Sequence, residues 1–263
     1  MKGIVVMQIW QFALIYLLLL VVLFVMKKSR IDQTRLLVIA SIRMTVQLIL
    51  AGLILTYIIQ NPHPLFTVAY FLLMTGFAIL RILRKNKGLN RGFQIAIAGS
   101  LFFSGLFVVV FFIALVVGES VFNPQYMIPV SGMVVGNAMT GTTLGVKTFR
   151  ESFSGQRNRI EALLNIGARP DQILLPFANQ AIETALLPTL NSMLGMGIIA
   201  LPGMMTGQIL SGTLPTTAIL YQIAIMIAIT TVVCLSVFGS LYFGYRSIYN
   251  DKNQILLESD PAA

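Results

Sequence analysis

The feature that most constrains this chain is a succession of long apolar runs. Several are about 20 residues long, which is the length of helix that crosses the hydrocarbon core of a bilayer. Charged residues make up 10% of the sequence, against roughly 25% in a soluble globular domain. The composition excludes a soluble domain and predicts an all-α, polytopic membrane protein.

About seven transmembrane helices are expected. They cover residues 8–26, 36–60, 64–80, 93–117, 126–147, 177–200 and 216–245. The first run is too long for the apolar core of a signal peptide and is followed by basic residues, so it is expected to stay as a membrane helix. The sixth contains Pro176 and Pro188, each of which removes a helical hydrogen bond, so a kink or break is expected there.

Lys and Arg alternate sharply between the connecting segments. Segments 27–35, 81–92 and 147–171 carry them, as does the tail, whereas loops 61–63, 118–125 and 201–215 have none. The positive-inside rule then predicts an outside N-terminus and a cytoplasmic C-terminus. The net charge of +9 is explained by this topology, so no nucleic-acid partner is expected.

Residues 1–250 are expected to form a single transmembrane domain, with a polar tail at 251–263. Segment 201–215 is short and rich in Gly, and two interpretations are open: a re-entrant loop or a plain external connection. The fifth span contains Gly132, Gly136, Gly141 and Gly145, whose spacing lets helix backbones approach closely. Packing within the chain is the default interpretation, with a dimer interface as the alternative.

The one long charged interruption, residues 148–171, is expected to form an amphipathic helix on the cytoplasmic side. Ile160, Leu163, Leu164 and Gly167 fall on one helical face, and Arg157 and Glu161 lie off it. The helix could lie on anionic lipid. It could instead be a coupling helix whose apolar stripe docks into a groove on a cytoplasmic ATPase. Gly167 would supply the C-cap, with Pro170 preventing continuation.

Polar side chains within the apolar runs are candidates for a substrate path, because a charge in hydrocarbon usually faces protein or water. The candidates are Arg43, Asn137, Thr140, Glu183 and Asn191, together with Met204 and Met205. Arg43 and Glu183 are expected to touch or to share a polar cavity. Asn137 and Thr140 could line a path or hydrogen-bond a neighbouring helix. Glu183 is the candidate metal ligand, since a carboxylate suits hard iron better than thioethers do.

Several motifs carry a family resemblance. Glu161-Ala162-Leu163 followed by Gly167 looks like the EAA loop of bacterial ABC-transporter permeases. The motifs Gly136-Asn137-Ala138-Met139, 185–190 and 201–210 resemble the FetB-like iron-export ABC permeases, a family that includes plant aluminium-tolerance permeases. The resemblance implies a permease in the bacterial inner membrane that takes part in metal homeostasis.

The chain has no phosphate-binding loop of the form Gly-x-x-x-x-Gly-Lys-[Ser/Thr], so a permease of this kind needs a separate ATP-binding subunit. ATP and Mg²⁺ would bind that partner, and this chain would hold no cofactor. One coupling segment per chain predicts a two-fold assembly of two permeases and two ATPases. The alternatives are an ABC permease for another substrate, such as a nucleotide sugar, or an autonomous carrier or channel. An intramembrane enzyme is not supported, because hydrolase and metalloprotease motifs are absent.

Overall fold

A computed structural model describes residues 8–249, and the regular elements of this part of the chain are helices. Its elements are α1 (Ile9–Leu14), α2 (Tyr16–Lys28), α3 (Thr34–Gln60), α4 (Pro64–Lys85), α5 (Arg91–Phe111), the π-helical η1 (Phe112–Val117), α6 (Pro124–Gly155), α7 (Arg157–Asn165), α8 (Pro170–Gly195), α9 (Gly203–Leu210) and α10 (Pro215–Arg246). The predicted all-α class is confirmed. The polar tail predicted at 251–263 lies outside the described residues.

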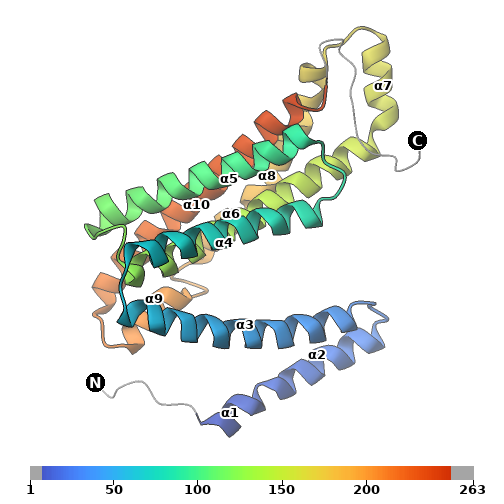
Figure 1. Cartoon of the computed structure of the whole chain (residues 1–263). Helices are drawn as coiled ribbons and strands as arrows, with labels where there is room; N and C mark the ends of the chain where they lie inside the picture. Colours follow the sequence, from blue (N-terminus) through green and yellow to red (C-terminus); the bar gives the residue numbers. More distant parts are fainter. Residues whose placement is uncertain (1–7, 250–263) are drawn as a thin grey trace.

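Helices α4, α5, α6, α8 and α10 pack lengthwise into one bundle (Figure 1). Helix α7 lies at one end of this bundle and α9 at the other, and we call these the α7 end and the α9 end. The basic segment 81–92, between α4 and α5, lies at the α7 end, whereas loop 118–125 lies at the α9 end. The basic segments that alternate along the sequence are therefore gathered at one end in space.

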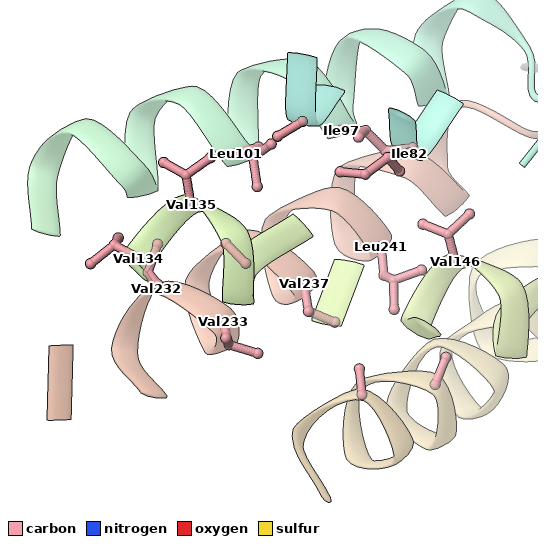
Figure 2. Packing of buried hydrophobic residues seen from close by; sticks show 14 of the residues in the cluster. Ile82, Ile97, Leu101, Val134, Val135, Val146, Val232, Val233, Val237 and Leu241 are labelled. Carbon is pink, nitrogen blue, oxygen red and sulfur yellow. The ribbon is translucent and has the colours of Figure 1, made fainter. Parts of the chain in front are cut away.

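The interior of the bundle includes branched aliphatic side chains from α4, α5, α6 and α10 (Figure 2). Leu101, Val134, Val146, Val237 and Leu241 are fully buried in it. Lipid tails are as apolar as these side chains, so the association of the helices depends on close packing rather than on removal from water. The branched side chains provide that packing because they interdigitate with little loss of rotamer freedom.

Two glycines bring α6 into close contact with α8 and α10. A Cβ atom on Gly141 would lie 2.6 Å from Cγ1 of Val233, and one on Gly145 would lie 3.0 Å from Cγ1 of Val237. The same Cβ on Gly145 would lie 3.3 Å from Cβ of Ala185 in α8. This pair of glycines therefore packs within the chain, as the default interpretation had it. A Cβ atom on Gly136, by contrast, would meet no atom of another helix within 4 Å.

The first helices stand apart from the bundle. Helix α2 has no buried residue, and in α3 the buried residue is Ile58, near its end. The two helices contact each other, and the hydroxyl of Tyr16 lies 2.5 Å from that of Thr45. Figure 1 shows α2 and α3 separated from α4–α10 along most of their length. Most of the α3 surface is thus free of contact with the rest of this chain.

Five helical stretches are long and apolar enough to cross a membrane: Trp10–Lys28, Thr34–Gln60, Pro64–Lys85, Arg91–Val117 and Pro215–Arg246. They coincide with five of the seven expected spans. The other two expected spans fall on α6 and α8, which are 32 and 26 residues long but more polar. Together these helices make the chain a multi-pass membrane protein.

The boundaries of α6 and α8 differ from the expectation. Helix α6 does not end at residue 147 but continues to Gly155, and α8 begins at Pro170 rather than near 177. Proline is favoured in the first turn of a helix because its missing N–H needs no partner there. Helix α8 also runs unbroken through Pro176 and Pro188. Of the kink or break expected at these prolines, the break is therefore absent.

We predict that Gly141→Ala destabilises the protein by about 1–3 kcal/mol, the usual cost of overpacking a core. The added methyl group would overlap Val233, and α6 and α10 would have to separate. Gly136→Ala is the matched control, because its methyl group meets no atom within 4 Å and alanine favours the helix. Denaturant unfolding of the purified protein measures both. Equal stability of the two variants would contradict the close contact.

Candidate functional site

The charged interruption is formed by the end of α6, the short helix α7 and the start of α8. The apolar stripe of α7 faces its own chain. Ile160 is 3% exposed and belongs to the buried cluster, and Leu163 and Leu164 pack half-buried against that cluster. The sequence analysis left two partners open for this stripe, anionic lipid or a groove on an ATPase. The structure uses it instead to attach α7 to the end of the bundle.

Helix α7 ends in a Schellman motif. The N–H of Gly167 donates to the carbonyl of Leu164, and the N–H of Ala168 donates to that of Leu163, both at 3.0 Å. Gly167 has a φ of 86°, in the left-handed region that glycine adopts without strain. Pro170 then starts α8. The predicted helix stop at Gly167 is confirmed, and it turns the chain sharply between α7 and α8.

The opposite face of α7 is exposed. Arg157 donates from Nε to Oε1 of Glu161 at 2.9 Å, one turn apart, and both side chains are exposed. An exposed pair of this kind adds little to stability. Ile166, directly after the helix, is 79% exposed. Arg157 and Glu161 on α7, and Ile166 directly after it, are thus exposed to solvent, and the sequence analysis did not single out Ile166 because it lies off the apolar stripe.

The two polar candidates on α6, Asn137 and Thr140, lie on its exposed side. Asn137 donates to the carbonyl of Met133 at 2.8 Å, and Thr140 donates to that of Gly136 at 3.0 Å. Both side chains bond the backbone of their own helix, and within the described chain neither forms the hydrogen bond to a neighbouring helix that was one of the two interpretations. Both residues are exposed on the single chain.

Helix α8 carries a second polar stripe. Gln180, Glu183 and Asn191 are exposed, whereas Ala181 and Ala185 on the other side of the helix are buried. Thr184 donates to the carbonyl of Gln180 at 2.9 Å. Helices α6 and α8 pack against each other, so the two stripes belong to adjacent helices. Four site candidates, Asn137, Thr140, Glu183 and Asn191, are therefore on this one pair of helices.

Arg43 is not part of this group. It is exposed on α3, and among residues 8–249 Glu183 forms no ion pair with it. The ion pairs of these residues join Lys147 to Glu151, Arg157 to Glu161 and Arg169 to Asp171. The expected contact between Arg43 and Glu183 is therefore absent within one chain.

Met204 and Met205 lie in α9. Met204 lines a pocket of about 320 Å³ at the α9 end, beside Gln125, Tyr126, Gln208 and Tyr221. Sequence reasoning did not find this pocket, because its residues come from four separate segments. Among the described residues no group of three or more His, Cys, Asp or Glu side chains could hold a metal ion. Glu183 is thus not part of a protein-built carboxylate or imidazole site.

Comparisons with known proteins agree with the motif resemblance. The uncharacterised protein family UPF0014 matches residues 9–249. The UPF0014 membrane protein YjkA of Bacillus subtilis is 30% identical, over 92% of this chain and 96% of its own. The probable iron export permease protein FetB of Escherichia coli is 29% identical, over 82% of each chain. The protein ALUMINUM SENSITIVE 3 of Arabidopsis thaliana is 32% identical, over 81% of this chain and 77% of its own. No solved structure matches the chain.

We predict that Gly167→Ala loosens the end of α7. Forcing a Cβ into a left-handed conformation costs about 1–2 kcal/mol. The amides of residues 167 and 168 should then exchange with deuterium about fivefold faster or more, as their hydrogen bonds open more often. Gly155→Ala is the control, since its Cβ would meet nothing within 4 Å and its φ is not positive. Unchanged protection in Gly167→Ala would show that the Schellman turn is unimportant.

Proposed function

Since this chain belongs to the UPF0014 family, we propose that it is the membrane-spanning permease subunit of an ABC transporter that exports iron. The energy would come from ATP hydrolysed by a separate subunit, which would also bind the ATP and Mg²⁺. This chain would then be a transport subunit without a catalytic site of its own.

The observation that carries the proposal is α7. It is a short amphipathic helix held between two membrane helices, at the end of the bundle where the basic segments gather. Its apolar side is attached to the bundle through Ile160, so a force applied to its exposed face would reach α6 and α8. That is the mechanical requirement for a membrane protein driven by a soluble motor. The exposed side chains of Arg157, Glu161 and Ile166 would contact the ATPase.

The sequence supports a motor on another polypeptide, because it contains no phosphate-binding loop. The positive-inside rule favours a cytoplasmic α7 end, where such a motor would be available. With one α7 per chain, two permeases and two ATPases would form a two-fold symmetric transporter in the bacterial inner membrane. The N-terminus would then lie outside and the C-terminus in the cytoplasm.

The polar stripes of α6 and α8 support a substrate route between the two permeases. A charged group at the centre of a lipid-facing helix costs about 2.5–3.5 kcal/mol on insertion scales. Glu183, exposed on a single chain, would avoid this cost if its stripe faced water or a second copy. Asn137, Thr140 and Asn191 would line the same route. The carboxylate would attract a cation weakly enough to release it again.

Iron as the substrate rests on the name of the Escherichia coli relative. Glu183 fits this substrate, because iron is a hard cation that prefers oxygen ligands. The other described candidates contribute amide oxygens, hydroxyls and thioethers, which bind a cation more weakly. A route of this kind would pass a metal ion without retaining it.

We predict that Ile166→Asp weakens binding of the ATPase subunit and reduces the ATPase stimulation by the permease. A charge would replace an exposed apolar side chain at the end of α7, and such a change at an interface hot spot usually costs more than about 1 kcal/mol. Ile198→Asp is the matched control, since Ile198 is also exposed but follows α8 at the other end of the bundle. Two measurements test this: the amount of ATP-binding subunit that co-purifies with each tagged permease, and the ATPase activity of the purified complex. Equal recovery of the ATPase with both variants would count against the proposal.

We also predict that Glu183→Gln lowers iron transport by reconstituted complexes about tenfold or more, while the complex still assembles and hydrolyses ATP. The change removes the one carboxylate of the α8 stripe but keeps its size. Glu119→Gln is the control, because Glu119 lies in a loop at the α9 end. Iron efflux from vesicles at several concentrations measures the effect. Iron efflux at the wild-type rate in the Glu183→Gln variant would show that this residue is not part of the route.

A further inference from the structure

A polar pocket of about 410 Å³ lies between the end of α4 and the last turns of α6. Lys85 reaches it from α4, and Lys147 and Arg150 reach it from α6. Helices α4 and α6 pack against each other along the bundle, so these cations are brought together by the fold and not by sequence proximity. The sequence analysis treated the same residues only as determinants of topology.

The pocket is electropositive. Glu151 is its one carboxylate, and its Oε1 lies 3.6 Å from Nζ of Lys147, with both side chains exposed. Lys85 and Arg150 form no ion pair with any of residues 8–249. Three cations against one carboxylate leave an excess of two positive charges around a space large enough for a small anionic group. The half-buried Arg150 is the least solvated of these cations.

The remaining lining residues suit an anion with several oxygens. Asn86, 3% exposed, is fixed by its donation to the carbonyl of Ile82 at 3.1 Å. Thr143 uses its hydroxyl to donate to Met139 at 2.7 Å. The free donors are thus the two ammonium groups, the guanidinium of Arg150 and the hydroxyl of Ser154. Guanidinium binds phosphate oxygens in pairs, and ammonium groups add point charges.

The pocket lies at the end of a candidate membrane span, because Lys85 is the last residue of α4. Thr140, Thr143 and Lys147 are spaced three and four residues apart and lie on one side of α6, so the pocket continues the polar stripe toward the α7 end. Basic residues that serve topology alone need only reach the interface, as the exposed Arg84 does from the same turn as Lys85. Basic pockets between membrane helices on the cytoplasmic side of a membrane are places where phosphate head groups bind.

We propose that this pocket binds a phosphate group, carried either by an anionic phospholipid or by a soluble phosphate compound. Lys85, Lys147 and Arg150 would hold the phosphate oxygens, and Glu151 would limit the affinity by its repulsion. The site is separate from the carboxylate of the α8 stripe. The proposal stands whether or not the protein is driven by an ATPase.

The full-length protein in nanodiscs tests this proposal, with two probes. Inorganic pyrophosphate is titrated into nanodiscs of neutral phosphatidylcholine, and thermal stability is compared between phosphatidylcholine and phosphatidylglycerol nanodiscs. The double variant Lys147→Gln/Arg150→Gln should respond about tenfold or more weakly to whichever probe stabilises the wild-type protein, because two charge-assisted contacts are lost. Arg84→Gln is the control and should respond as the wild type does.

A second variant keeps the test decisive if the double variant does not fold. Glu151→Gln removes an exposed carboxylate and should strengthen binding about threefold, the size expected for one exposed charge. A response to pyrophosphate alone assigns the site to soluble phosphate compounds, and a response to phosphatidylglycerol alone assigns it to lipid. The proposal is overturned if neither probe stabilises the protein. It is also overturned if the double substitution and Arg84→Gln have equal effects, or if Glu151→Gln weakens binding.

Discussion

The arrangement of the bundle depends on close helix contacts at glycines in a lipid solvent. Helices in a membrane gain nothing from leaving water, so they associate where their backbones fit closely. On α10 such a place is Gly239, against Ser100 on α5; on α6 it is Gly141 and Gly145, against Val233 and Val237 on α10 and Ala185 on α8. Asn137 lies one turn before Gly141 and Thr140 lies next to it, and both are exposed beside this contact. The packing of small residues therefore also decides where the polar ones point.

Much of the fold could be predicted from the sequence, because apolar run length and basic loops act locally. Five spans are found by apolarity, and α6 and α8 fall on the remaining two expected runs. The helix stop at Gly167 also followed from local chemistry. The ends of α6 and α8 did not, because α6 continues as a helix beyond Lys147 and Pro170 can start a helix as readily as stop one.

The candidate site was harder to predict because it depends on tertiary contacts. An apolar stripe such as Ile160, Leu163 and Leu164 has the same sequence pattern whether it packs on its own chain or on a partner. Arg43 and Glu183 have compatible positions along their helices, but nothing in the sequence says that α3 stands apart from α8. The pocket around Lys85 and Arg150 joins residues far apart in the chain, which no local pattern links.

The unbroken length of α6 has a mechanical consequence. Its 32 residues span about 48 Å at 1.5 Å per residue, and its tightest contact lies at Gly141 and Gly145, nearer the α7 end. That contact acts as a fulcrum. About 15 Å of helix lies between Gly145 and Gly155, and about 26 Å between Gly141 and Pro124. Any rigid tilt of α6 would therefore move its far end in the opposite direction and by more than the displacement applied beside α7.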